Sequence, residues 1–183
     1  MQRIGNSGFQ PYKHRKNGKM KRDVLAFNRD EFVGRFSNCF RDGKLLAERA
    51  YDHAYAPVFD SAGVFIALRS QFRAAGSTEK LAILKAYTPL DPGVRAARIV
   101  SDESRSAGLG AMTADQQTRL LSLLASYAGK FGFGAIFVVR NYTTAELLAS
   151  LEVRLASDNE TEMLTTYREV ERLAEIQVEA CFS

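Results

Sequence analysis

Tryptophan is absent from the chain, and cysteine, histidine and proline are scarce, with two, two and four residues among 183. His14 lies in a basic N-terminal stretch, and His53 is expected at the surface or at a helix cap. No group of histidine, cysteine and carboxylate residues has the spacing of a metal site. The sequence also lacks a phosphate-binding loop, a dinucleotide fingerprint and a nucleophile elbow. These absences argue against a metallohydrolase and against a nucleotide-dependent enzyme.

Long apolar runs are missing too. No stretch approaches the roughly 18 apolar residues that a membrane-spanning helix needs. The charged N-terminus is not followed by an apolar segment, so no secretory signal is expected. Cys39 and Cys181 lie far apart in the sequence. This favours reduced thiols in a cytoplasmic protein, and a disulfide between the two is the alternative.

Acidic residues are absent from the first 22 positions, which contain seven basic residues: Arg3, Lys13, Arg15, Lys16, Lys19, Lys21 and Arg22. The whole chain has 25 basic and 21 acidic residues, so the remainder has 18 against 21 and a net charge of −3. We expect residues 1–27 to form a basic, disordered tail and residues 28–183 to form one helical domain. The tail is either a solvated extension or an arm that binds nucleic acid or an anionic membrane surface.

Helical periodicity is the dominant pattern after the tail. It predicts an all-α, single-domain bundle of about seven or eight helices, with a short extended segment after Phe133. One helix is expected from Lys44 to about Tyr55, and Pro89 and Pro92 should end another. The expected N-terminal caps are Asn28 or Asp30, Asp60 or Ser61, Ser77, Thr113 with Gln116, Thr143 with Glu146, and Asn159 with Glu162.

A glycine-rich break separates a leucine-rich helix from an apolar run. Tyr127 to Gly134 contains three glycines, and Ala135 to Val139 is rich in β-branched and aromatic residues. Glycine permits unusual backbone conformations, and the residues that follow favour an extended path. Peptide groups in such a break need partners. The segment is therefore either a helix cap with a buried connector or a backbone site for an anion or an amide.

A second candidate lies in residues 102–109, where Asp102 and Glu103 precede Arg105 and an Ala-Gly-Leu sequence. A carboxylate at a helix boundary is a candidate acid or base. The alternative is a structural carboxylate that pairs with Arg105 or with backbone N–H groups.

Taken in order, these pieces resemble the 2-oxo-4-hydroxy-4-carboxy-5-ureidoimidazoline (OHCU) decarboxylase family over roughly residues 29–180. The resemblance is carried by Glu103 with Ala107-Gly108-Leu109, by Tyr127-x-x-Lys130-Phe131-Gly132-Phe133, and by Arg154-Leu155, Asn159, Glu162 and Glu169-Val170. The family is all-helical and needs no cofactor. It removes a carboxylate from a ureido-imidazoline acid and makes (S)-allantoin at the end of urate oxidation. The resemblance also implies a homodimer, since family members are often dimers.

The resemblance assigns roles to individual residues. Glu103 falls on the family's catalytic Glu, and Tyr87 falls on its catalytic His, followed by Thr88 as a substrate contact. Gln177 falls on a late Arg that binds substrate. The family's substrate-holding backbone falls on Ala135, Ile136, Phe137, Val138 and Val139.

At two of these positions, the residue in this chain differs from the family's residue in its acid–base chemistry or its charge. A phenol has a pKa near 10, whereas an imidazole titrates near neutral pH. Tyr87 is therefore expected to donate a hydrogen bond rather than to act as a base. Gln177 cannot pair with a carboxylate as a guanidinium does. Either substitution should weaken transition-state stabilisation.

Three functional hypotheses follow. The first is a divergent decarboxylase of urate catabolism, with Glu103 as the acid or base and Tyr87 as a proton donor or orienting group. The second is an inactive protein of the same fold that binds a ligand or has a structural role. The third is a helical adaptor whose basic tail binds nucleic acid or a membrane.

Overall fold

The computed structural model describes residues 27–53, 60–87, 112–139 and 142–183. These residues form seven α-helices and no strand, which confirms the predicted all-α class. The helices are α1 (Arg29–Phe36), α2 (Lys44–Asp52), α3 (Ser61–Ala74), α4 (Ser77–Ala86), α6 (Ala114–Phe131), α7 (Thr144–Ala156) and α8 (Asn159–Ala180). Predictions for the tail up to residue 26, for Thr88 and for Glu103 fall outside the described residues.

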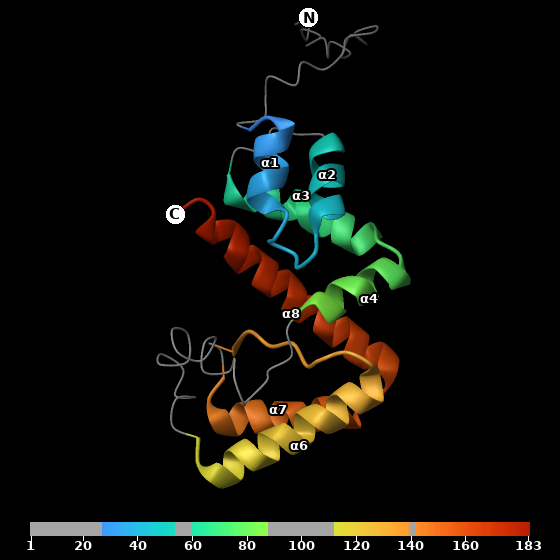
Figure 1. Ribbon diagram of the computed structural model, residues 1–183, viewed down its shortest axis with the longest axis vertical. Coiled ribbons are helices and arrows are strands. Elements are labelled where there is room, and N and C mark those ends of the chain that lie inside the picture. Colours follow the sequence, from blue (N-terminus) through green and yellow to red (C-terminus); the bar gives the residue numbers. More distant parts are fainter. Residues whose placement is uncertain (1–26, 54–59, 88–111, 140–141) are drawn as a thin grey trace, which may run out of the picture.

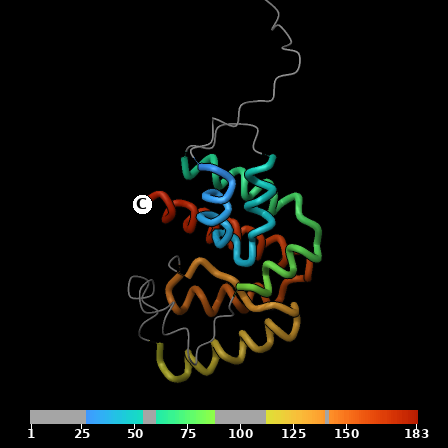
Figure 2. The backbone as a smooth tube through the Cα atoms, turned by 45° about the horizontal axis from the view of Figure 1, so that its top comes forward, coloured from blue at the N-terminus to red at the C-terminus, as the bar shows by residue number. Residues whose placement is uncertain are grey.

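The long helix α8 joins two groups of helices. Helices α1, α2 and α3 pack together at one end of the molecule, and α6 lies along α7 at the other (Figure 1). Helix α8 begins beside α6 and α7 and runs to α3, which it contacts directly (Figure 1). In both views the C-terminal end of α4 lies beside the segment that follows α6 (Figures 1 and 2).

One apolar core joins the helix groups, and aromatic residues fill much of it. Phe32 and Phe36 are one helical turn apart on α1, so both rings enter the core, with centroids 4.9 Å apart. Phe40 stacks on Phe72 of α3 at the same centroid distance. Tyr167 of α8 meets the Phe72 ring edge-on at 5.6 Å, which attaches the long helix to this end of the core.

Most of the predicted helix starts are confirmed. Three helices begin with a reciprocal capping box: Asn28 caps α1, Thr113 caps α6 and Thr143 caps α7. Asp60 caps α3 through the backbone N–H of Gly63. Each box satisfies two N–H groups that the first helical turn leaves without partners.

Three boundary predictions were wrong by one to three residues. Helix α4 is capped by Gly76 rather than Ser77, which is already helical. Helix α8 is capped by Asp158 rather than Asn159, because the Asp158 carboxylate accepts from both the N–H and the hydroxyl of Thr161. Helix α2 ends at Asp52 and not near Tyr55, with His53 as its C-cap.

Both cysteines are free thiols, and Cys39 is buried. Within the described ranges, no helix has the length and apolar character needed to cross a bilayer.

Candidate functional site

The chain between α6 and α7 crosses the core without forming a regular helix. Helix α6 ends at Phe131, and Gly132 takes a left-handed conformation with φ of 76°, which turns the chain out of the helix. Residues 135–139, referred to below as the clamp segment, are all buried. This is the predicted cap followed by a buried connector. Its peptide groups have little access to water, so they need partners within the protein or on a ligand.

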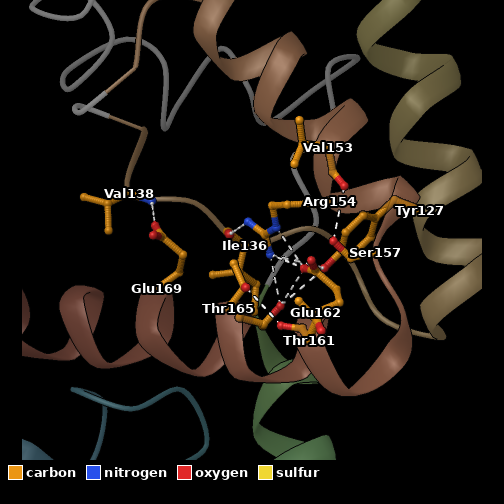
Figure 3. A network of polar contacts seen from close by, with 11 residues as sticks. Tyr127, Ile136, Val138, Val153, Arg154, Ser157, Thr161, Glu162, Thr165 and Glu169 are labelled. Carbon is orange, nitrogen blue, oxygen red and sulfur yellow. Dashed lines mark hydrogen bonds and ion pairs between the residues drawn. The ribbon is translucent and has the colours of Figure 1, made fainter.

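Two charged side chains hold the clamp segment from neighbouring helices. Nη1 of Arg154, on α7, donates to the carbonyl oxygen of Ile136 at 2.7 Å. The N–H of Val138 donates to Oε2 of Glu169, on α8, at 2.8 Å (Figure 3). The other carboxylate oxygen of Glu169 accepts a hydrogen bond from Arg172 at 3.3 Å. Helices α7 and α8 thus fix Ile136 and Val138, on either side of Phe137, through charge-assisted hydrogen bonds.

Arg154 is itself held in a buried polar network. Its Nε and Nη2 atoms donate to the same oxygen of Glu162, at 2.8 and 2.5 Å. Nη2 also donates to Oγ1 of Thr166 at 3.0 Å. The same atom donates to the hydroxyl oxygen of Tyr127 at 3.2 Å (Figure 3). Tyr127 donates to Glu162. Arg154 is 5% exposed and Glu162 is fully buried, so the two opposite charges compensate each other away from water.

The protonation states of this network follow from its geometry. Burial lowers the pKa of the Arg154 guanidinium, but its hydrogen bond to Glu162 and the nearby Tyr127 outweigh this effect, and the pKa is raised overall. Burial and the hydrogen bond to Glu162 also raise the pKa of Tyr127, so its phenol stays protonated and remains a donor. Oε2 of Glu162 has no hydrogen-bond partner among the described residues.

Aromatic rings enclose the guanidinium. The central carbon of Arg154 lies 4.3 Å from the ring centroid of Phe137 and 5.6 Å from that of Tyr127. The Phe137 ring also meets Tyr142 edge-on at 5.4 Å. The side chain of Phe137 is therefore immobilised by packing, which restricts the backbone at the centre of the clamp segment.

Tyr87 is the C-cap of α4 and packs against the same core. Its hydroxyl is buried and has no hydrogen-bond partner among the described residues. Burial raises the pKa of Tyr87 to about 12. The backbone and the positive charge of nearby Arg41 lower this pKa in part, but burial outweighs them. At neutral pH the phenol is an unused hydrogen-bond donor and not a base.

Of the remaining predicted side chains of the site, the structure describes only Gln177. Gln177 is exposed near the end of α8, and its carbonyl accepts from the N–H of Cys181 at 3.2 Å. Glu103 and Thr88 lie outside the described residues. The structure therefore places Tyr87 at the end of α4 that lies beside the segment following α6, and it leaves the association with Glu103 a prediction.

The polar network was not predicted as part of the site, although the sequence contains a signal for it. Leu151 follows Leu147 by four residues and Arg154 follows Leu151 by three, which places a charged residue on the apolar face of α7. Glu162 and Glu169 share the buried stripe of α8 in the same way. A charge on an apolar face indicates a buried partner, and here the partners are each other and the clamp backbone.

Comparison with known proteins gives consistent results. The sequence profile of the family described as OHCU decarboxylase matches residues 26–179. The chain is 25% identical to the "2-oxo-4-hydroxy-4-carboxy-5-ureidoimidazoline decarboxylase" of Haloferax volcanii, over 87% of this chain and 94% of that protein. It is also 25% identical to the "Uric acid degradation bifunctional protein" of Bacillus sp. (strain TB-90), over 83% of this chain. That match spans 30% of the Bacillus protein.

A solved structure has the same fold. The crystal structure of (S)-allantoin synthase superposes with a TM-score of 0.70 at 21% sequence identity. The match covers 87% of this chain and 52% of that one. At this identity the likeness establishes the helical architecture and does not by itself assign an activity.

Proposed function

Because the chain belongs to the OHCU decarboxylase family, we propose that it acts in urate breakdown, where it converts the ureido-imidazoline acid OHCU into (S)-allantoin with loss of carbon dioxide. The observation that carries the proposal is the clamp segment. Its backbone is buried, and two helices hold it through Arg154 and Glu169. A backbone fixed in this way is suited to orient a small, polar, planar substrate.

The reaction needs orientation and one proton. The bond between the ring carbon and the carboxylate breaks, carbon dioxide leaves, and the electron pair is delocalised into the substrate's own ring. A proton then adds to that carbon from one face, which makes the product a single enantiomer. The protein's part is to hold the ring, to exclude water and to deliver the proton from a fixed direction.

Tyr87 and Glu103 are the residues to which we assign this proton chemistry. Tyr87 replaces the family His, and its pKa of about 12 keeps the phenol protonated. In our proposal it donates a hydrogen bond to the substrate, and Glu103 is the group that exchanges the proton. Thr88 and Gln177 would complete the contacts to the substrate. Without an imidazole at position 87, we expect slower turnover than a His would support.

The test is an optical assay. Urate is oxidised by urate oxidase in the presence of the hydrolase that acts on its first product, and circular dichroism follows the appearance of (S)-allantoin. The protein should produce optically active (S)-allantoin in proportion to its concentration, whereas the spontaneous reaction adds the proton to either face and gives a racemate. An unchanged rate at high protein concentration would exclude the decarboxylase activity.

A ligand-binding protein without turnover is the second candidate, and Tyr87 is the observation that favours it. Its buried hydroxyl offers a donor but no base, and Gln177 supplies no positive charge. On this alternative, allantoin binds with a measurable dissociation constant in calorimetry while the optical assay shows no acceleration. Acceleration with normal saturation by substrate would reject it.

A further inference from the structure

The peptide groups on both sides of Phe137 are fixed by side chains from two helices. The carbonyl of Ile136 accepts from Arg154, and the N–H of Val138 donates to Glu169. Arg154 is anchored in turn by its ion pair with Glu162. Two consecutive peptide planes of the clamp segment are thus set by the protein itself, before any ligand binds.

Fixing these planes also fixes the two polar backbone groups of Phe137. All described peptide bonds are trans, and in a trans peptide the C=O and N–H bonds point in opposite directions. The Ile136 carbonyl and the Phe137 N–H share one plane, so this N–H points away from Arg154. The Phe137 carbonyl and the Val138 N–H share the next plane, so this carbonyl points away from Glu169.

Neither of these Phe137 groups makes a hydrogen bond within the described parts of the chain. Yet Phe137 is only 5% exposed, and buried peptide groups in native proteins nearly always have partners. One residue therefore offers a donor and an acceptor, both directed away from the polar network. A ureido or amide group carries the complementary pair, a C=O next to an N–H.

We propose that Arg154 and Glu169 are positioning residues, which direct the N–H and C=O of Phe137 toward the ureido or amide edge of the bound ligand. The inference takes its ligand class from the proposed function. The family resemblance already implies that this backbone holds the substrate, and the inference adds the side chains that orient it. Neither side chain needs to touch the ligand, so neither is a catalytic residue.

The experiment uses the full-length, ¹⁵N-labelled protein and (S)-allantoin as the probe. In the wild type, titration with allantoin should shift the Phe137 amide resonance more than that of Val138, whose N–H is already bonded to Glu169. Glu169→Leu removes the acceptor, and Glu169→Gln keeps a carbonyl oxygen at the same place. Arg172→Gln is the matched control, because it removes the ion pair with Glu169 and leaves the Val138 bond intact.

We expect Glu169→Leu to speed hydrogen exchange at the Val138 amide and to weaken allantoin binding by about tenfold or more, the effect of losing one charge-assisted hydrogen bond. Glu169→Gln and Arg172→Gln should stay within about threefold of the wild type, because both keep the acceptor. Unchanged binding in a folded Glu169→Leu variant would overturn the proposal. If that variant does not fold, the wild-type titration decides, since a Phe137 amide that does not respond to allantoin also overturns it.

The outcomes separate this inference from the proposed function. Allantoin binding that depends on Glu169, together with no optical activity, supports the positioning role and rejects the decarboxylase. Normal decarboxylation with no response at Phe137 rejects the positioning role and leaves the decarboxylase standing.

Discussion

Arg154 and Glu162, eight residues apart in the sequence, form a buried ion pair that joins the last turn of α7 to the first turn of α8. The same guanidinium binds the carbonyl of Ile136. The contact that ties the two helices together therefore also orients the clamp segment. Stability and the geometry of the proposed site depend on one side chain.

Replacing one partner of this pair should be costly. Arg154→Met leaves the fully buried Glu162 without its counter-charge, and we expect a loss of about 3–5 kcal/mol in the free energy of unfolding. The double variant Arg154→Met with Glu162→Leu should lose less than the sum of the two single variants, with a coupling energy of roughly 1–3 kcal/mol. Urea unfolding of the four proteins measures both quantities. Additive losses would show that the pair does not act as a unit.

Removal of the hydroxyl should affect the stability of the protein differently at Tyr127 and at Tyr87. Tyr127 donates to Glu162, so Tyr127→Phe should destabilise the protein by about 1–3 kcal/mol. The Tyr87 hydroxyl has no partner in the described structure, so Tyr87→Phe should be within about 0.5 kcal/mol of the wild type or slightly more stable. Chemical denaturation at neutral pH compares them directly. A large loss in Tyr87→Phe would mean that its hydroxyl has a structural partner.

The helical frame follows from the sequence because its signals are local. Capping boxes at Asn28, Thr113 and Thr143 and the apolar spacing of each helix depend on residues a few positions apart. The wrong boundaries at Ser77 and Asn159 arise because neighbouring residues are almost equally good caps, and small differences in backbone geometry decide between them.

The site was only partly predictable because its contacts are long-range. The clamp segment was found through its glycines and its resemblance to a family. The bonds from Arg154 to Ile136 and from Val138 to Glu169 span 18 and 31 residues, and no local pattern specifies them. Charges on apolar helix faces indicate that such partners exist, but the three-dimensional packing chooses them.

Alkaline pH should reveal the buried phenol of Tyr87. Its pKa is about 12 in the folded protein, against an ordinary value near 10, so the unfolded chain releases this proton first as the pH rises. The stabilising contribution is complete below about pH 10 and is lost as the pH rises toward 12, by about 1.4 kcal/mol per pH unit. Urea unfolding between about pH 9 and pH 11 measures the slope.

The pKa of Tyr127 is also raised in the folded protein, so the wild type should lose stability through both tyrosines as the pH rises. Tyr87→Phe removes one of them and should flatten the pH dependence. An identical slope in the wild type and in Tyr87→Phe would contradict the assignment of a raised pKa to Tyr87.

The two cysteines should differ sharply in reactivity. Burial raises the pKa of the Cys39 thiol to about 12, with a smaller contribution from neighbouring Cys181, and Cys39 is only 4% exposed. Cys181 is partly exposed at the end of α8. Ellman's reagent near neutral pH should therefore modify Cys181 first and Cys39 only after unfolding, because the thiolate is the reactive form. In Cys181→Ser the native reaction should disappear. Two thiols that react equally fast in the native protein would contradict this order.

Tyr87→His is the most direct test of whether the proposed site has kept the rest of its machinery. An imidazole at this position titrates near neutral pH and is able to exchange a proton, which the phenol with its pKa of about 12 cannot do. If Glu103 and the clamp segment are in place, (S)-allantoin formation should rise by about a hundredfold or more, the low end of general acid–base effects. Tyr87→Phe is the matched control and should show no gain, since it removes the donor without adding a base.

A Tyr87→His variant that folds and binds allantoin but gains no activity would place the missing chemistry elsewhere. The exposed Gln177, in the position of the family Arg, would then be the next residue to restore, because a guanidinium there can form a bidentate ion pair with the carboxylate that leaves, and a neutral amide cannot.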